Sequence, residues 1–217
     1  VPTAHSQSLN AATWVATPNG VVGTQQSITV RAPRSAGKTV TVTFTNAAAG
    51  TNAGQVVVNT QGFAYLPWTP DLPGTWRITA AMSGRDLGST TISVDPRPTT
   101  TSLLAPGAVR EGRSTTLLAF VQATGGTITP SGTITVRDQS NDVVATGTLG
   151  STDEPGTAAA SIEWVPVTGP VRLVASYSPS SSAFSPSTSL AQTPVVGGTQ
   201  AVALRLPPVS YVGVTET

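Results

Sequence analysis

The chain carries few side chains that could perform catalysis, and they stand far apart. The single histidine, His5, has no Ser-Asp pattern and no metal-ligand pattern around it, so a Ser-His-Asp triad is not expected. Before residue 100 the only carboxylates are Asp71, Asp86 and Asp95, each beside turn-forming residues. Glycoside hydrolysis needs two carboxylates about 5–10 Å apart across a cleft. The sequence therefore predicts that this protein is not an enzyme.

Metal-binding and crosslinking chemistry have equally few candidates. Calcium would accept the oxygen ligands of DQSND (Asp138–Asp142) and TDEP (Thr152–Pro155), but the first segment also has the Asn and Asp residues of a hairpin turn. The sequence favours the turn and predicts no metal site and no cofactor. Cysteine is absent, which excludes disulfides, thiolate zinc sites and a thiol nucleophile. A Lys–Asn crosslink is not expected either, because Lys38 is the only lysine and its half of the chain has no Glu to assist it.

Charge and hydropathy exclude further classes of partner. The net charge is +1 and only 10% of residues are charged, against about 25% in typical proteins. No basic face is available for a phosphate backbone, so nucleic acid is not an expected partner. No run approaches the roughly 18 apolar residues of a membrane-spanning helix. The opening VPTAHSQS is small, polar and irregular, as is typical after removal of a secretory signal, and it favours a secreted or cell-envelope location.

Any functional side chain must be positioned by strands, because the chain alternates apolar and polar residues at period two. Runs such as QSITVRA, TVTVTFT and GTITVRD show this alternation. Clusters of Gly, Pro, Asn and Ser separate the runs at intervals of about 8–12 residues, as in a sandwich. The chain holds 18 prolines, and an interior proline costs a helix about 3 kcal/mol. The predicted fold class is therefore all-β.

A repeated phrase divides the chain into two units. WTPDLPGTWRITA begins at Trp68 and WVPVTGPVRLVAS begins at Trp164, 96 positions later. Each unit contains about seven short strands, the number that one two-sheet sandwich needs. The join, DPRPTTTS, holds two prolines that restrict the backbone, which predicts a stiff link and a rod. The expected divisions are an irregular segment at 1–12, a first sandwich at 13–96, a second sandwich at 97–195 and a further segment at 196–217.

The alternation also assigns faces to the strand that ends in each tryptophan. Trp68 marks the inward side, whereas Phe63 and Tyr65 fall on the outward side, where the second unit has Ala159 and Ser161. An outward aromatic pair is a candidate contact surface, so Phe63 and Tyr65 are the predicted binding residues. The alternative is that the pair covers its own sheet or a neighbouring domain. The residues expected in the two cores are Val40, Val42, Trp68, Ile78, Ile134, Val136, Trp164 and Leu173.

The last residues repeat the opening of the second unit. ALRLPPVSYVGVTET (Ala203–Thr217) matches SLLAPGAVREGRSTT (Ser102–Thr116), with Gly213 on Gly112. Either a third unit begins here, or residues 203–217 form a free C-terminal strand. A free strand could add to the open sheet edge of another protomer and produce self-association.

Several of these segments together resemble a known family. The P-G-x-V-x-x-G turn, SGTITVRD, the tryptophan-anchored strand and VASYSPSSSAFSPSTS are similar to bacterial immunoglobulin-like repeat domains. The resemblance is best over 99–194 and weaker over 13–96. SPSSSAF lacks the acidic residue that the family usually has before the final aromatic. The resemblance implies tandem immunoglobulin-like β-sandwiches in a surface or secreted protein that spaces, binds or assembles, and it specifies no ligand.

Together these features predict a non-catalytic spacer or binding module, with a protein or a cell-wall glycan as its partner. Two alternatives stay open. One is a structural subunit of a larger assembly, such as an appendage or virion, that pairs through residues 203–217. The other is an accessory domain of an extracellular glycan-active enzyme, which an adjoining catalytic domain would select.

Overall fold

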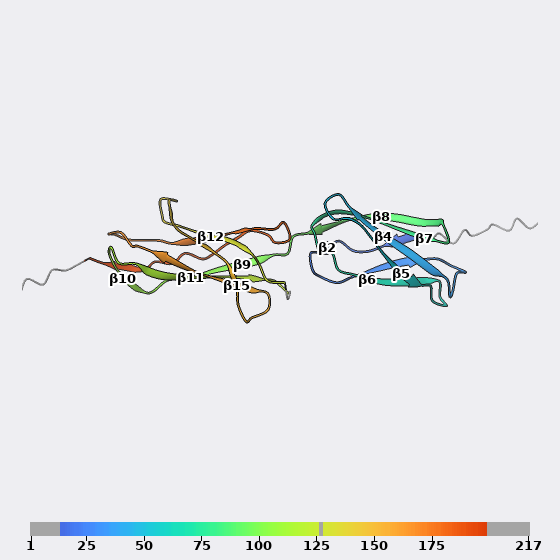
Figure 1. Cartoon of the computed structure of the whole chain (residues 1–217), viewed down its shortest axis with the longest axis horizontal. Helices are drawn as coiled ribbons and strands as arrows, with labels where there is room; N and C mark the ends of the chain where they lie inside the picture. The colour runs from blue at the N-terminus through green and yellow to red at the C-terminus, as the bar shows by residue number, and fades with distance from the viewer. Residues whose placement is uncertain (1–13, 126–127, 199–217) are drawn as a thin grey trace, which may run out of the picture.

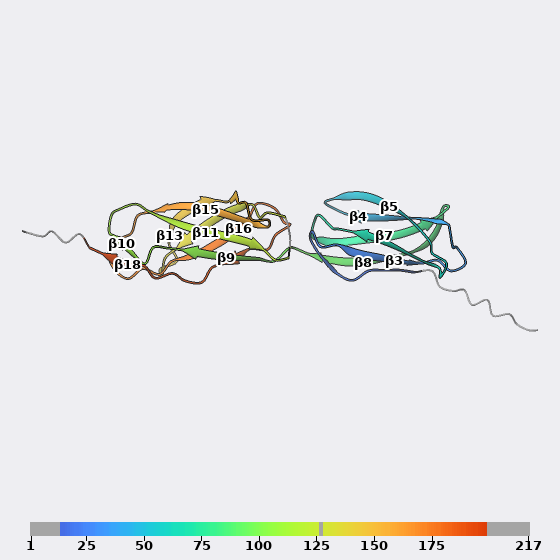
Figure 2. The ribbon, with the colours of Figure 1, turned by 90° about the horizontal axis from the view of Figure 1, so that it is seen from below.

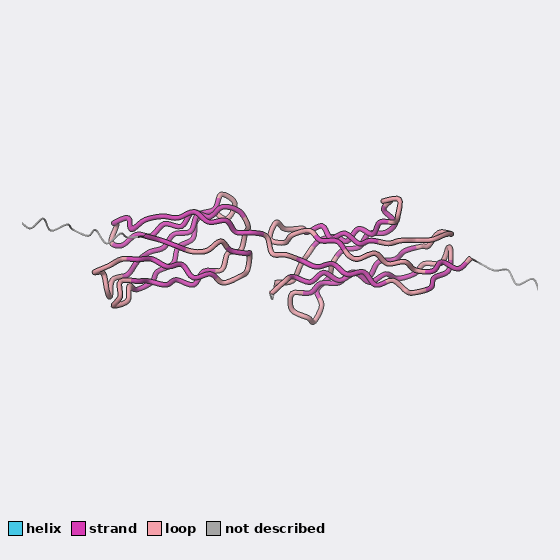
Figure 3. The backbone as a smooth tube through the Cα atoms, turned by 180° about the vertical axis from the view of Figure 1, so that it is seen from behind, coloured by secondary structure: helices cyan, strands magenta, loops and turns pink. Residues whose placement is uncertain are grey.

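The computed structural model of the protein describes residues 14–125 and 128–198. Within these ranges every regular element is a strand, and Figure 3 shows the strands joined by loops. The all-β class predicted from the period-two alternation is therefore confirmed. This part of the chain contains no helix that could span a membrane. The predicted irregular segment 1–12, which includes His5, and the predicted strand 203–217 lie outside the described residues.

The first sandwich consists of two facing sheets, coloured blue to green in Figure 1. The smaller sheet contains, in spatial order, β1 (Trp14–Ala16), β3 (Gln26–Arg31) and β6 (Phe63–Trp68). The larger sheet contains β2 (Gly20–Val21), β8 (Arg85–Asp95), β7 (Gly74–Met82), β4 (Thr39–Asn46) and β5 (Gly50–Val57). All pairs are antiparallel except β2 with β8, which run in parallel.

The core of the first sandwich lies between these sheets. In β4 the side chains of Val40, Val42 and Phe44 are buried, and the threonines between them are not. Ile28 of β3 and Ile78 of β7 join the same cluster and are fully buried. Successive side chains of a strand point to opposite faces, so the alternation of Thr and Val produces this burial directly. The predicted core positions in β4 and β7 are confirmed.

Trp68 differs from the prediction that it lies inside the core. It is half-buried and packs against the edge of the core cluster. Its ring stacks on Phe44, with centroids 4.9 Å apart and an interplanar angle of 13°, and meets Trp76 edge-on at 5.1 Å and 70°. Trp76 is only 3% exposed and takes the buried position. Three large rings share one end of this core, and Trp68, the last residue of its strand, is the ring left partly in water.

The second sandwich repeats this plan with small changes (green to red in Figure 1). One sheet contains β14 (Gly150–Ser151), β15 (Thr157–Trp164), β11 (Thr115–Ala123) and β9 (Thr99–Leu104). The other contains β13 (Val143–Thr148), β12 (Gly132–Arg137), β16 (Val174–Pro179) and β17 (Ser187–Thr188). A parallel pair, β10 (Ala108–Arg110) with β18 (Val195–Gly197), completes it. The last ladder thus runs two residues past the predicted domain end at 195.

The second core contains its tryptophan. Trp164 is 3% exposed, and Leu173, Ile134 and Val136 are fully buried around it, as predicted. Tyr177 of β16 is also buried, and its hydroxyl donates a hydrogen bond of 2.9 Å to the carbonyl of Ser131. A buried phenol needs such a partner, so this polar atom is satisfied inside an otherwise apolar cluster.

One glycine in each sandwich lets the two sheets approach each other at one side. Gly54 of β5 lies over Leu66 of β6, where a Cβ atom would stand 2.8 Å from the leucine Cδ2. Gly147 of β13 lies over Ile162 of β15, where a Cβ atom would stand 2.6 Å from the isoleucine Cγ1. Real Cβ atoms do not approach so closely, so a side chain at either position would have to displace its neighbour. The repeated glycine keeps both sandwiches closed on this side.

The two sandwiches lie end to end along one axis (Figures 1 and 2). The first described strand, β1, begins at one pole of the molecule, and the last, β18, ends at the opposite pole. In each sandwich the strand by which the chain leaves runs beside a short strand from early in that unit, β8 beside β2 and β18 beside β10, and each pair lies on the exit side. The chain therefore traverses both sandwiches from pole to pole.

Candidate functional site

The strand that carries the predicted binding residues begins at a turn built around Asn59. The Asn59 side-chain oxygen accepts hydrogen bonds from the backbone amides of Gln61 (2.9 Å) and Phe63 (3.0 Å), and the Asn59 amide donates to the Phe63 carbonyl at 2.7 Å. Gly62 completes the turn with φ at +83°, a conformation that glycine adopts without strain. This local network fixes where β6 starts and which way its first residue points.

Phe63 and Tyr65 lie on the outer face of the small sheet, as the alternation predicts. Ala64 between them is buried, whereas Tyr65 is 52% exposed. The two rings stack with centroids 6.2 Å apart and an interplanar angle of 19°. Across the sheet, Arg31 of β3 pairs with Phe63 and places its guanidinium carbon 5.9 Å from the ring centroid. We call Arg31, Phe63 and Tyr65 the aromatic face.

Arg31 was missed by sequence reasoning because its role depends on strand pairing. It lies more than thirty positions before Phe63 in the chain, and only the β3–β6 register brings them together. A guanidinium within about 6 Å of a ring centroid is attracted by the ring's negative face. The aromatic face therefore combines two flat apolar surfaces with one positive charge, a combination suited to stacking and hydrogen bonding rather than to bond cleavage.

The second sandwich has a different outer surface at the same place. Its β15 carries Ala159 and Ser161 at the positions of the two rings, but the neighbouring strand β11 pairs Phe120 with Ala159 and Leu118 with Ser161. Leu118 is 41% exposed, and Leu104, its partner on β9, is 56% exposed. The small side chains Ala159 and Ser161 thus describe the outer face of β15 alone. The neighbouring strand β11 carries the apolar side chains Leu118 and Phe120, which an alignment of β6 with β15 does not include.

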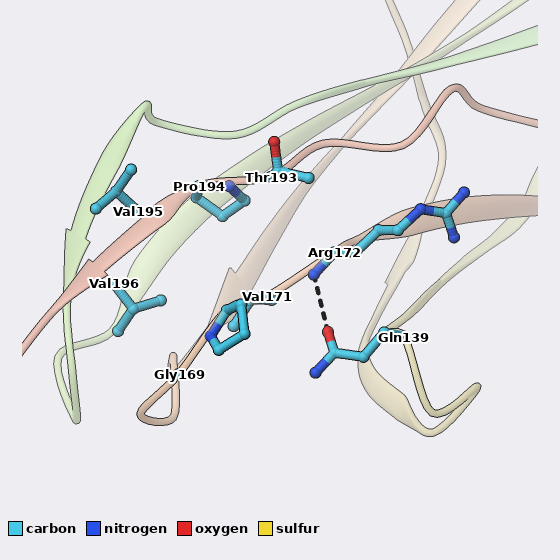
Figure 4. Close-up of a pocket in the computed structure, with 9 residues that line it drawn as sticks. Gln139, Gly169, Val171, Arg172, Thr193, Pro194, Val195 and Val196 are labelled. Carbon is cyan, nitrogen blue, oxygen red and sulfur yellow. Dashed lines mark hydrogen bonds between the residues drawn. The ribbon is translucent and has the colours of Figure 1, made fainter.

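A hollow lies beside β18, the last described strand (Figure 4). Its volume is about 540 Å³, and its lining includes Val171, Pro194 and Val196. The backbone amide of Arg172 donates a 2.9 Å hydrogen bond to the side-chain oxygen of Gln139 across one side. The Arg172 guanidinium lies on the side of the opening away from Val195 and Val196. The hollow offers an apolar floor with a cation at its rim and no group placed for catalysis among the residues that line it.

The acidic segments form turns, as the sequence favours. In DQSND, an Asp138 carboxylate oxygen accepts hydrogen bonds from the amides of Ser140 (2.8 Å) and Asp142 (3.0 Å), and Asn141 has φ at +68°. The oxygen is thus engaged in holding the turn. Within 14–125 and 128–198, no group of three or more His, Asp and Glu residues lies close enough together to hold a metal ion.

One carboxylate on the second sandwich has a shifted titration. Glu163 of β15 accepts hydrogen bonds from the hydroxyls of Ser114 and Thr116, the second at 2.8 Å. These bonds, the one from Ser114 most, lower the pKa of Glu163 below its ordinary value of 4.5. Hydrogen bonds to a carboxylate favour its charged form. Glu163 is exposed on β15, and its two donors lie at the start of β11 and directly before it, so these hydrogen bonds join the two neighbouring strands.

No protein-family model matches the sequence, and no curated protein matches it. Similar solved structures include the adhesin InvE of Yersinia pseudotuberculosis, with 20% identity over 84% of this chain and 58% of that one and a TM-score of 0.43. Invasin, a bacterial integrin-binding protein, has 15% identity over 81% of this chain and 38% of that one, with a TM-score of 0.48. A tetra-tandem repeat from the extending region of a large adhesion protein has 17% identity over 84% of this chain and 49% of that one, with a TM-score of 0.40. The chain spans less than two thirds of each. The likeness concerns the fold only and carries no argument about function.

Proposed function

We propose that this chain is a non-catalytic spacer and binding module of a secreted or cell-envelope protein. The observation that carries the proposal is the pole-to-pole path of the chain through two sandwiches stacked end to end (Figure 1). A chain that enters at one pole and leaves at the other separates whatever is attached to its two ends by the length of both sandwiches. Compactly folded pairs of domains would not achieve that separation.

The spacer role is tested by small-angle scattering of the chain in solution. Two sandwiches held end to end give an elongated particle with a pair-distance distribution that has a long tail and two contributions, one within and one between the sandwiches. A compact, nearly spherical envelope would mean that the sandwiches fold back on each other, and the spacer role would be wrong.

The binding role is assigned to the aromatic face. Aromatic side chains anchor many protein contacts because they bury a large rigid surface at little entropic cost, and flat rings also stack on sugar rings. Tyr65 is 52% exposed, and Phe63 and Tyr65 stand side by side with the Arg31 guanidinium over Phe63. The partner class that fits is therefore a cell-wall glycan or the apolar surface of a protein.

The double variant Phe63→Ala, Tyr65→Ser copies the second sandwich at these positions and tests the assignment. Wild type and variant are incubated separately with purified cell-wall glycan and with an envelope protein extract. We expect wild type to be retained in one arm and the double variant to be retained at least about tenfold less, a loss of roughly 1.4 kcal/mol or more. Leu118→Ser, which removes an exposed apolar side chain elsewhere, is the matched control and should bind like wild type.

Two results would contradict the assignment. Equal retention of the double variant and the wild type would remove the aromatic face from the binding site. Unfolding of the double variant would place the two rings in the core, because substitutions of exposed residues usually change stability by no more than about 0.5 kcal/mol.

A further inference from the structure

The sandwiches meet around a buried arginine in the linker. Arg97 stands between Pro96 and Pro98 and is only 1% exposed. Its Nε donates a 2.9 Å hydrogen bond to the carbonyl of Val22 in the first sandwich. Its Nη1 donates a 3.0 Å hydrogen bond to the carbonyl of Thr124 in the second. One planar side chain therefore contacts both bodies at once.

The backbone of Arg97 belongs to the second sandwich. Its amide donates to the carbonyl of Ala183 at 2.8 Å, and its carbonyl accepts from the amide of Ser185 at 2.9 Å. These bonds form a parallel bridge with Phe184, which lies in the second core. The second sandwich holds the arginine in place, and the side chain extends from it into the end of the first.

The chemistry of the contact requires a guanidinium. A buried cation is costly unless its donors are satisfied, and the three hydrogen bonds of Arg97 use neutral oxygens, the third being the hydroxyl of Thr24 at 3.4 Å. Arginine presents five donors in a rigid plane, whereas a lysine ammonium is a single compact point. A lysine at this position could not reach Val22 and Thr124 in the same geometry.

The first sandwich leaves room for this arginine at Gly23. A Cβ atom there would stand 2.7 Å from Arg97 Nη2 and 2.6 Å from Ile128 Cδ1 of the second sandwich. Gly112 is its counterpart at the far pole: the Gly23 amide donates to Pro70 as the Gly112 amide donates to Pro166. The two have nearly the same φ, +71° and +69°, yet nothing lies within 4 Å of a Cβ at Gly112.

We propose that Arg97 is a latch that fixes the two sandwiches in one relative orientation, and that the prolines beside it do not fix this orientation by themselves. Two of its acceptors, on Val22 and Thr24, belong to the first sandwich, and the third, on Thr124, belongs to the second. Only one arrangement of the sandwiches brings all three within reach of the Arg97 guanidinium. Loss of any part of this contact releases the sandwiches to reorient while each stays folded.

Paired spin labels measure the orientation directly. The chain has no cysteine, so cysteines placed at two exposed strand positions, Thr91 of β8 and Ser161 of β15, label each sandwich once. We expect a single narrow distance distribution in this labelled background. Arg97→Lys and Arg97→Ala should broaden it at least about twofold, whereas Pro96→Ala and Pro98→Ala should leave it narrow. Narrow distributions in both Arg97 variants, or broadening in the proline variants alone, would overturn the latch.

A glycine pair tests the same contact without touching the arginine. Gly23→Ala and Gly112→Ala introduce the same backbone strain, because alanine is disfavoured at positive φ, but only the first intrudes on Arg97 and Ile128. We expect Gly23→Ala to broaden or shift the distance distribution and Gly112→Ala to leave it as in the labelled parent, with both sandwiches folded by circular dichroism. Equal distributions in the two variants would contradict the latch, even if the Arg97 variants failed to fold.

Discussion

Trp68 and Trp164 occupy the same place in the repeat but differ in their surroundings. Trp164 belongs to the second core cluster and is 3% exposed. Trp68 shares its end of the first core with Phe44 and Trp76 and stays half-buried. Sequence position alone therefore does not determine burial, because burial depends on the volume of neighbours that come from other strands.

Replacing the two tryptophans should have unequal effects on stability. We expect Trp164→Ala to lower the unfolding free energy of the second sandwich by about 3–5 kcal/mol, since it leaves a large cavity in the core. Trp68→Ala should cost the first sandwich less, about 1–2 kcal/mol, because part of its ring is already in water. Differential scanning calorimetry of the full chain measures both. A Trp68 cost equal to or above that of Trp164 would contradict the burial difference.

Glu163 should make the second sandwich sensitive to acid. Its pKa is lowered in the folded state, so its ionised form contributes stability that is fully present above the ordinary value of 4.5 and is lost as pH falls through the lowered pKa. Carboxyl chemical shifts measured by NMR from pH 7 to 2 report this titration. Removing both donors, with Ser114→Ala and Thr116→Val, should move the pKa back up towards 4.5. An unchanged titration would mean that the two hydroxyls are not the cause.

At the scale of elements, the sequence predicts which face of a strand a side chain occupies better than it predicts which strands pair. The inward and outward sides of β6 follow from period two, and Ala64 and Tyr65 lie where that rule puts them. Period two gives no information on which strands become neighbours. It therefore misses Arg31 beside Phe63, and it misses β14, which covers the edge of β15.

The last strands of the two units also differ for a reason that lies in the residues. In the first unit β8 is continuous from Arg85 to Asp95. In the second unit the corresponding segment is split into β17 and β18, with Pro186 directly before β17 and Pro194 directly before β18. Proline cannot donate a ladder hydrogen bond, so the strand is interrupted there. The sequence contains these prolines, but aligning the two repeats does not predict that they interrupt the last strand of the second unit.

The two sheet-closing glycines give a prediction at this scale. In Gly147→Ala the new Cβ meets Cγ1 of Ile162, a side chain that is 1% exposed and cannot turn away. In Gly54→Ala it meets the tip of Leu66, which is half-buried and can rotate. We expect Gly147→Ala to lower the unfolding free energy by about 1–3 kcal/mol, as overpacking does, and Gly54→Ala to cost less. Calorimetry that shows equal costs would mean that Leu66 is held as firmly as Ile162.

At the scale of the whole molecule, the rod was predicted from composition and its cause was not. Two prolines in DPRPTTTS suggested stiffness, whereas the structure shows that the residue between them, Arg97, contacts both bodies. Local sequence could not indicate this role, because the acceptor carbonyls of Val22 and Thr124 lie 75 and 27 positions away. In the sequence, this contact between the sandwiches corresponds only to an arginine between two prolines, Pro96 and Pro98.

The joint should be insensitive to salt. Arg97 is buried and bonds neutral oxygens, whereas exposed ion pairs are screened over about 3 Å at 1 M salt. The distance distribution between labels at positions 91 and 161 should therefore stay the same from roughly 0.05 to 1 M sodium chloride, which spans weak to near-complete screening. Broadening at high salt would show that surface charges, rather than this buried contact, hold the sandwiches together.

The parallel pairs at the two exits, β2 with β8 and β10 with β18, determine how the rod responds to mechanical load. Tension on its two ends pulls β10 towards one pole and β18 towards the other, along the direction of both strands. The backbone hydrogen bonds between them lie across that direction, so they are loaded in shear and must fail together rather than open one at a time. Each sandwich is thus clamped where the chain passes through it, and under force this protein would extend by losing whole sandwiches rather than by gradual peeling of strands.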